Sequence, residues 1–132
     1  MRISILFGAM VVVAGLMTTA RAAEHTMDTT DTVKKALADD SAVLLDVREK
    51  SEWDGGHLKE AKLLPLSTLK GGVKAEDVAK IISKDKVIYC HCASGFRCLK
   101  AADELKKLGY DVRPLKLGYA DLLKAEFAPA GK

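Results

Sequence analysis

The cysteines of the chain all lie within residues 90–98, in the stretch CHCASGFRC. Cys92 is followed by four uncharged residues and then by Arg97; the four are Ala93, Ser94, Gly95 and Phe96. A thiol and a guanidinium at the two ends of a short loop suit nucleophilic chemistry on an anion, because the thiolate attacks and the cation holds negative charge. Cys92 is therefore the candidate nucleophile.

The loop precedes a predicted helix, and this order makes it a candidate anion cradle. The unpaired N–H groups of a first helical turn carry partial positive charge, and a curled loop can direct its own N–H groups at one anion. Gly95 permits the backbone angles of such a curl, and Arg97 adds a permanent cation. We expect this field to lower the pKa of the Cys92 thiol and to hold a persulfide anion, Cys–S–S⁻.

The length of the loop favours a small ligand. Cysteine phosphatases place five residues between the nucleophilic Cys and the Arg, whereas Cys92 and Arg97 have four between them. The shorter loop encloses less space, which suits a single terminal sulfur atom better than a tetrahedral phosphate. A phosphatase or an enzyme resembling arsenate reductases remains an alternative use of the same loop.

The segments around the loop predict an α/β fold with a small, mainly parallel sheet and helices on both of its faces. Apolar runs predict strands over 42–48, 61–66, 86–91 and 111–116. Residues 24–30 form a polar lead-in. Periodic apolar positions predict a helix that begins near residue 30 and further helices over 74–85, 98–110 and 118–127.

Two features of these segments bear on the loop. In the helix over 98–110 the apolar stripe is predicted to be Leu99, Ala102, Leu105 and Leu108. In open sheets of this kind, ligands bind beyond the carboxyl ends of the strands. The Cys92 loop leaves the strand over 86–91 at that end, which is where the fold would place a site.

Two motifs in the right order resemble the rhodanese-like sulfurtransferase family. The stretch LLDVREKSEWDGGHLKEAKLLPL is similar to the early motif of the family, with matches at Asp46, Val47, Arg48, Glu52, Gly56, His57, Leu58, Ala61 and Pro65. The stretch VIYCHCASGFRCLKAADELKKLGYDVRPLKLGYADL is similar to its active-site half, with a Cys-x-x-x-x-Arg loop between a strand and a helix. The resemblance covers about residues 30–127.

The resemblance implies a single rhodanese-like domain, over residues 24–132, with Cys92 as the catalytic residue that carries sulfur as a persulfide. Sulfane sulfur would come from thiosulfate or polysulfide and pass to a thiol or a cyanide-like acceptor. The substrate anion would be bound by the rest of the loop, Ala93, Ser94, Gly95, Phe96 and Arg97. No metal or organic cofactor is implied. Thiosulfate-specialised members often carry further cations in this loop, which here has only Arg97.

Cys98 leaves a second class of function open. It lies in the first turn of the helix and could attack a Cys92 persulfide to form a disulfide, as resolving cysteines do; the alternative is a small residue that only packs. With Cys92 it could also serve a protein partner as a non-catalytic sulfur carrier or thiol-redox module. Cys90 alternates with His91 in a buried strand, so we expect it to pack in the core rather than to join a metal site.

Other polar residues are assigned supporting roles. Asp46 and Arg48 lie at the end of the strand over 42–48, on the side of the predicted site, and we expect them to pair and brace the loop rather than to touch substrate. His57 follows two glycines in a turn. Its spacing does not place it near Cys92, so we do not expect a Cys–His dyad.

The first 23 residues have the pattern of a cleavable export signal. Arg2 precedes an apolar run over 3–17, and Ala20-Arg21-Ala22 fits a small-x-small cleavage site. The run is short for a bilayer span, so we expect cleavage after Ala22 or Ala23 and a periplasmic or secreted protein that is free of the membrane. Cleavage removes two of the 21 basic residues and leaves a net charge near +1, which gives no reason to expect a nucleic-acid partner. The expected partners are a small sulfur-donor anion, a thiol acceptor and, for a carrier, a protein that accepts sulfur.

Overall fold

The computed structural model describes residue 15 and residues 21–131. Within this part of the chain, four parallel strands form one sheet in the order β2-β1-β3-β4. The strands are β1 (Ala42–Asp46), β2 (Ala61–Leu63), β3 (Val87–His91) and β4 (Val112–Pro114). The two long apolar runs of the sequence are the central strands, because a strand with neighbours and helices on all sides must be apolar throughout.

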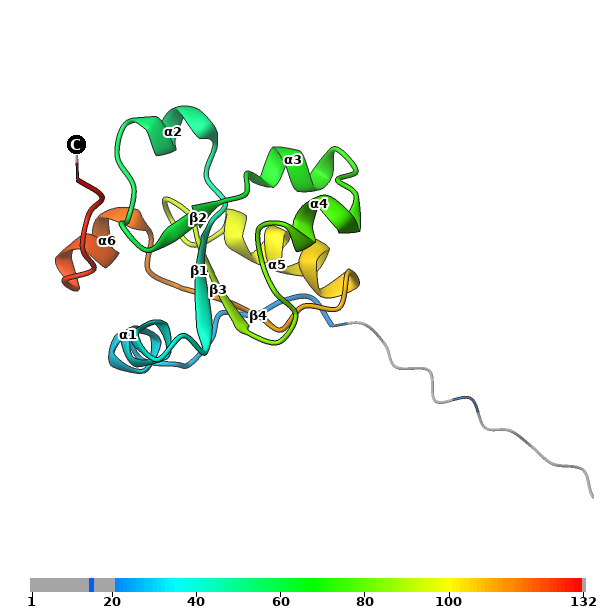
Figure 1. Ribbon diagram of the computed structural model, residues 1–132, viewed down its shortest axis with the longest axis horizontal. Helices are drawn as coiled ribbons and strands as arrows, with labels where there is room; N and C mark the ends of the chain where they lie inside the picture. The colour runs from blue at the N-terminus through cyan, green and yellow to red at the C-terminus, as the bar shows by residue number, and fades with distance from the viewer. Residues whose placement is uncertain (1–14, 16–20, 132) are drawn as a thin grey trace, which may run out of the picture.

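Helices cover both faces of this sheet (Figure 1). In the described part of the chain they are α1 (Thr30–Ala38), α2 (Lys50–Asp54), α3 (Leu66–Lys70), α4 (Ala75–Ala79), α5 (Arg97–Lys107) and α6 (Tyr119–Lys124). Helices α3, α4 and α5 lie against one face, and α1 and α6 lie against the other (Figure 1). The predicted α/β fold with a parallel sheet and helices on both faces is confirmed.

The two layers follow from the alternation of side chains along β1. Val43 and Leu45 pack in one buried cluster with residues of α3, α4 and α5. Leu44 packs in a second cluster with Val33 of α1 and Leu122 of α6. Since successive residues of a strand point to opposite faces, a single continuous apolar run supplies the core on both sides of the sheet.

The buried face of α5 differs from the predicted stripe. The buried residues are Cys98, Ala101, Ala102 and Leu105, whereas Leu99 and Leu108 are only half-buried. The prediction is wrong at both ends of the stripe, because the face of α5 that meets the core follows the i, i+3, i+4, i+7 positions from Cys98 rather than the leucines. This rotation puts the thiol of Cys98 in the core, next to the loop.

Two further predictions are corrected by the structure. The helix predicted over 74–85 is the short α4, after which Ile82 is still buried in a turn. Helix α3, which the sequence analysis did not predict, begins directly after Pro65, whose fixed φ suits the position before a helix. Both short helices supply only one or two buried side chains each, so their periodicity in the sequence is weak.

The polar lead-in over 24–30 is held against the domain. The Thr26 N–H donates to the carbonyl oxygen of Pro114, at 2.8 Å. The Asp28 carboxylate accepts from the Tyr89 hydroxyl at 2.6 Å and from Arg113 at 3.0 Å. This segment therefore runs along β4, which would otherwise be the free edge of the sheet (Figure 1).

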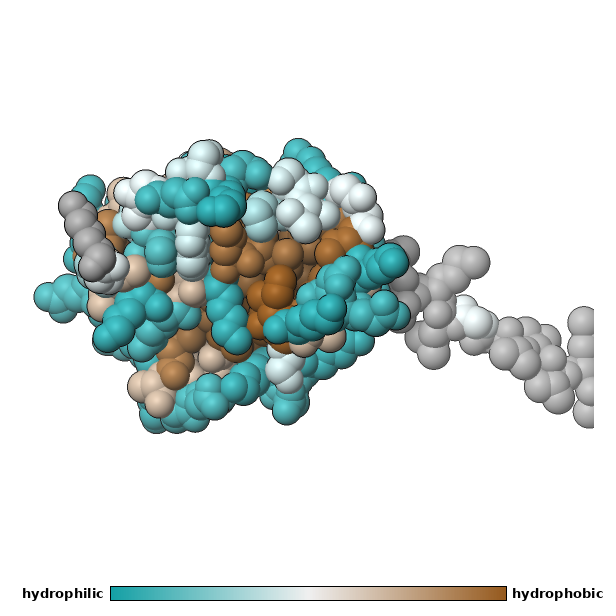
Figure 2. All heavy atoms as spheres, turned by 45° about the horizontal axis from the view of Figure 1, so that its top comes forward, coloured by the Kyte–Doolittle hydropathy of each residue, from teal (hydrophilic) through white to brown (hydrophobic). Residues whose placement is uncertain are grey.

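The face drawn in Figure 2 has polar residues around its margin and apolar residues gathered in its middle. Among the residues that the structure describes, no helix has both the length and the apolar character that crossing a bilayer requires. The predicted signal segment over 1–23 lies almost wholly outside the described residues. The division of the chain at residue 23 therefore stays a prediction.

Candidate active site

The loop from Cys92 to Arg97 joins the carboxyl end of β3 to the amino end of α5, where the sequence predicted it. Gly95 makes the turn possible, since its φ is +89° and only glycine adopts such angles readily. A Cβ atom at Gly95 would lie 2.5 Å from the carbonyl oxygen of Lys116. The loop is thus packed on the segment after β4 so closely that no side chain fits at this position.

Backbone N–H groups surround the sulfur of Cys92. The Gly95 N–H donates to Cys92 Sγ at 3.1 Å, and the N–H groups of Ser94 and Cys98 act on the same sulfur and favour its anion. Cys92 itself is fully buried, while Ala93 and Ser94 face solvent. These N–H groups favour negative charge on Cys92, and the role of the loop in binding a substrate anion stays a prediction.

The pKa of the Cys92 thiol is raised in this structure. Hydrogen bonding with the Cys98 thiol is the largest cause, burial of the sulfur is the next, and the N–H groups of Cys98 and Ser94 oppose them. The expected lowering of the pKa is wrong for the resting thiol, because the sequence analysis counted the dipoles of the loop but not a second thiol beneath it.

Arg97 is held by a carboxylate from α2. Its two terminal nitrogens donate to the two carboxylate oxygens of Glu52, at 2.6 and 2.8 Å. The guanidinium lowers the pKa of Glu52 to about 2, so the pair stays charged at neutral pH. Hydrogen bonding with Glu52 is the largest cause that raises the pKa of Arg97, and negative charge on Cys92 would add to it. Glu52 was matched to a motif in the sequence, but its role as the partner of Arg97 was missed.

Asp46 and Arg48 form the pair that the sequence predicted. Arg48 Nη2 lies 2.8 Å from Asp46 Oδ2 and also donates to the Gly56 carbonyl at 2.8 Å, and both side chains are buried. The guanidinium lies over the ring of Tyr119, at 4.1 Å from its centroid. The Tyr119 N–H in turn donates to the Cys92 carbonyl at 2.9 Å. The pair thus supports the start of the loop through Tyr119.

Gly118 fixes the other side of the loop. Its backbone packs on Ala93 so closely that a Cβ atom would lie 1.7 Å from the Ala93 carbonyl oxygen. The sequence analysis assigned Gly118 only to the start of a helix. A glycine in that position is common, and nothing in the spacing indicated that the Cys92 loop would rest on it.

Three histidines lie in or near this region, and two of them, His25 and His91, contact backbone carbonyls of the loop. His25 Nε2 lies 2.5 Å from the Gly95 carbonyl oxygen, a contact that the sequence analysis missed because residues 24–30 carried no motif. His91 is buried, and burial lowers its pKa, so its ring is neutral. His57 stacks on Trp53 with ring centroids 3.6 Å apart. Neither His57 nor His91 contacts the Cys92 thiol within the described residues.

The other two cysteines lie on the core side of the loop. Cys98 Sγ donates to the Gly95 carbonyl at 3.2 Å and lies 3.4 Å from the Leu115 carbonyl oxygen. Cys90 Sγ is 3.4 Å from the Cys98 carbonyl oxygen and fully buried, as predicted. All three thiols are free. Within residues 21–131, no group of His, Cys, Asp and Glu is arranged to hold a metal ion.

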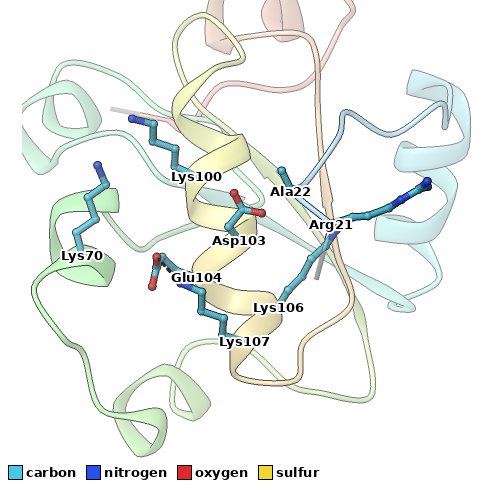
Figure 3. Close-up of a pocket in the computed structure, with 8 residues that line it drawn as sticks. All are labelled: Arg21, Ala22, Lys70, Lys100, Asp103, Glu104, Lys106 and Lys107. Atoms are coloured by element: carbon cyan, nitrogen blue, oxygen red, sulfur yellow. Dashed lines mark hydrogen bonds and ion pairs between the residues drawn. The ribbon is translucent and has the colours of Figure 1, made fainter. Parts of the chain in front are cut away.

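A cavity of about 540 Å³ lies along α5, away from the loop (Figure 3). It is lined by Arg21, Ala22, Lys70, Lys100, Asp103, Glu104, Lys106 and Lys107. The Asp103 carboxylate accepts from the Ala23 N–H at 2.7 Å and so ties the start of the described chain to the helix. No residue of the Cys92 loop lines this cavity, so the candidate chemistry is not there.

Comparison with known proteins agrees with this geometry. The model of the rhodanese-like domain matches residues 29–125. The chain is 40% identical to the uncharacterized protein YqhL of Bacillus subtilis over 79 residues, which are 59% of this chain and 58% of YqhL. It is 34% identical over 85 residues to a protein of Schizosaccharomyces pombe named as a candidate mitochondrial thiosulfate sulfurtransferase, covering 58% of this chain and 59% of that protein. The chain thus spans less than two thirds of either relative.

Solved structures show the same fold. The single-domain sulfurtransferase RDL2 of Saccharomyces cerevisiae is 22% identical and superposes with a TM-score of 0.65, covering 84% of this chain and 99% of that one. The human single-domain sulfurtransferase TSTD1 is also 22% identical, with a TM-score of 0.59 and coverage of 80% and 97%. These similarities confirm the rhodanese-like α/β fold of the described domain.

Substitution of Gly118 by alanine is expected to displace the loop. The added Cβ would overlap the Ala93 carbonyl, so Gly118→Ala should slow the reaction of Cys92 with a sulfur donor by about a hundredfold or more, as expected when a preorganised group is misplaced. Gly55→Ala is the control, because a Cβ there meets nothing closer than 3.5 Å. Equal rates of sulfur uptake in Gly118→Ala and the wild type would contradict this account of the loop.

Replacement of Cys98 by alanine is expected to lower the pKa of Cys92, because hydrogen bonding with Cys98 is the largest cause that raises it. The ultraviolet absorbance of the Cys92 thiolate should then appear at lower pH in Cys98→Ala than in the wild type. Below the pKa, each unit of lowering gives about ten times more thiolate. Subtraction of the titration of the matching Cys92→Ser protein isolates the signal of Cys92. An unchanged titration would show that burial alone sets the pKa.

Proposed function

The chain belongs to the rhodanese-like domain family, and on that basis we propose that it is a sulfurtransferase whose catalytic residue is Cys92. Cys92 takes sulfane sulfur from polysulfide or thiosulfate and passes it to a thiol or a cyanide-like acceptor. The observation that carries the proposal is the set of N–H groups around Cys92 Sγ, with the Gly95 N–H at 3.1 Å. Donors in such fixed positions stabilise a developing anion without having to reorganise.

The reaction consists of two displacements at sulfur. The Cys92 thiolate attacks the sulfane sulfur of the donor, the S–S bond of the donor breaks, and sulfite or a shortened polysulfide leaves with the electron pair. The persulfide Cys92–S–S⁻ carries its charge one atom further out than the thiolate. The acceptor then attacks the outer sulfur and returns Cys92 to the thiolate. The atoms and electrons balance without a metal or an organic cofactor.

The electrostatics of the loop favour polysulfide over thiosulfate as the donor. Ala93, Ser94 and Phe96 carry no charge, and the cation Arg97 is already paired with Glu52 at 2.6 and 2.8 Å. A thiosulfate dianion would meet little unpaired positive charge here. A phosphate would also meet little unpaired positive charge, and the loop is one residue shorter than that of the cysteine phosphatases. We therefore do not propose phosphatase chemistry.

Steady-state transfer of sulfur from polysulfide to cyanide, measured as thiocyanate, tests this proposal. Cys92→Ser should lower the rate by about a thousandfold or more, as loss of a nucleophile does. Ser94→Ala is the matched control, because the exposed side chain is lost while the N–H group stays in the cradle. The proposal fails if Cys92→Ser keeps the wild-type rate. Hydrolysis of an aryl phosphate faster than sulfur transfer would favour the phosphatase alternative.

We also propose that the chain is exported and cut after Ala22, which makes it a periplasmic or secreted protein. The support is the Ala23 N–H, which donates to Asp103 Oδ1 at 2.7 Å. Figure 3 shows the Asp103 carboxylate directed toward the segment that carries Ala22. Cleavage after Ala22 would turn the Ala23 nitrogen into an ammonium group and the hydrogen bond into an ion pair. Cleavage after Ala23 would remove this contact.

The mass of the protein recovered from the periplasm of a bacterium expressing the full sequence decides the cleavage site. We expect a chain that begins at Ala23. Asp103→Asn should be cut at the same place and lose less than about 1 kcal/mol of unfolding free energy, since partly exposed ion pairs contribute little. A chain that begins at Glu24, or one that keeps its first residues, would contradict the proposal.

A further inference from the structure

We infer that Cys98 is a resolving thiol: it attacks the Cys92 persulfide, releases sulfide and leaves a Cys92–Cys98 disulfide. The inference rests on the proposed persulfide of Cys92. It adds a second activity to sulfur transfer, which is the reduction of sulfane sulfur to sulfide at the expense of a dithiol.

Gly95 is hydrogen-bonded to the sulfurs of both Cys92 and Cys98. Its N–H donates to Cys92 Sγ at 3.1 Å, and its carbonyl oxygen accepts from Cys98 Sγ at 3.2 Å. Both sulfurs are therefore held by the two ends of the same residue of the loop. Hydrogen bonding between the two thiols is also the largest cause that raises the pKa of Cys92.

The direction of approach suits a displacement. Cys98 belongs to the buried face of α5 and lies on the core side of the loop. Ala93 and Ser94 are exposed, so the loop opens to solvent on their side. Attack by Cys98 from the core on the inner sulfur of the persulfide would therefore expel the outer sulfur toward solvent. A displacement at sulfur needs this opposed arrangement of the attacking and leaving groups.

The step balances as follows. The bond between Cys92 Sγ and the outer sulfur breaks, and a bond between Cys92 Sγ and Cys98 Sγ forms. The outer sulfur leaves with the electron pair and is reduced to sulfide, while the two cysteine sulfurs are oxidised to a disulfide. Hydrogen bonding with the Cys90 thiol, and then burial, raise the pKa of Cys98 to about 12, so the thiol brings a proton that the leaving sulfide takes. An external dithiol must then reduce the disulfide and reset the site.

Cys90 is the matched control within the same cluster. Its sulfur lies 3.4 Å from the Cys98 carbonyl, and it is as buried as the other two cysteines. The hydrogen bonds of the Cys90 thiol are to Cys98, and no interaction of this thiol with Cys92 is found among the described residues. Replacing Cys90 by alanine should therefore perturb the packing near the site as Cys98→Ala does, while leaving the resolving step intact.

A single loading experiment tests the inference. Reduced mature protein is exposed briefly to polysulfide, freed of excess donor and kept without thiol, and its intact mass and the released sulfide are measured over time. The wild type and Cys90→Ala should release one sulfide per chain and end lighter than the reduced protein by two hydrogens. Cys98→Ala and Cys98→Ser should keep one added sulfur and release none.

Each other outcome has a distinct meaning. A wild type that keeps its added sulfur as Cys98→Ala does would overturn the resolving role and leave the proposed sulfurtransferase standing. Sulfide release by both Cys98 variants would also overturn the resolving role, since a group other than Cys98 would then attack the persulfide. If no variant that retains Cys92 gains sulfur, the proposed function itself fails. If Cys90→Ala and Cys98→Ala unfold at similar temperatures, lost packing does not explain a difference between them in sulfide release.

Discussion

The hydrogen bonds of Gly95 organise the whole site. The N–H of this residue binds the Cys92 sulfur, and its carbonyl oxygen binds the Cys98 sulfur and the ring of His25. Glycine adopts the positive φ that makes this possible far more readily than other residues do, and the backbone of Lys116 leaves no room for a side chain. The nucleophile, the second thiol and the amino-terminal segment are thus coupled through one residue. Any movement of this residue would change the surroundings of both sulfurs.

The sheet and its buried polar groups hold the loop in this shape. Strands β1 and β3 pair side by side, so Asp46 at the end of one lies beside His91 at the end of the other, directly before Cys92. The buried pair of Asp46 and Arg48 then reaches the loop through Tyr119. Such a pair is costly to bury unless its hydrogen bonds are made. The hydrogen bonds between Asp46 and Arg48 are made, so this pair is a rigid support, and rigid donors are the ones that stabilise an anion well.

The sequence was sufficient to predict the sheet, the place of the loop and the pairing of Asp46 with Arg48, because each depends on local patterns or on the order of motifs. It was not sufficient for contacts that depend on how distant segments pack. The partner of Arg97 is Glu52, 45 residues away, and the backbone contact of Gly118 with the loop has no signal in the spacing. The raised pKa of Cys92 was missed for the same reason. That pKa depends on which face of α5 is buried. The sequence analysis took this face from the leucines of the helix, whereas Cys98 and two alanines occupy most of it.

The rate at which Cys92 takes up sulfur in Gly95→Ala tests the central claim most directly, because that change removes the geometry of the cradle while leaving every reactive side chain in place. Gly72→Ala is the matched control: Gly72 also has a positive φ, of +84°, but a Cβ there would meet no atom within 4 Å. Both variants suffer the same backbone strain, so a difference between them reports on the loop. We expect Gly95→Ala to load sulfur from polysulfide about a hundredfold more slowly than Gly72→Ala, the size of effect seen when one anion-binding donor is lost. Equal loading rates in the two variants would contradict the account.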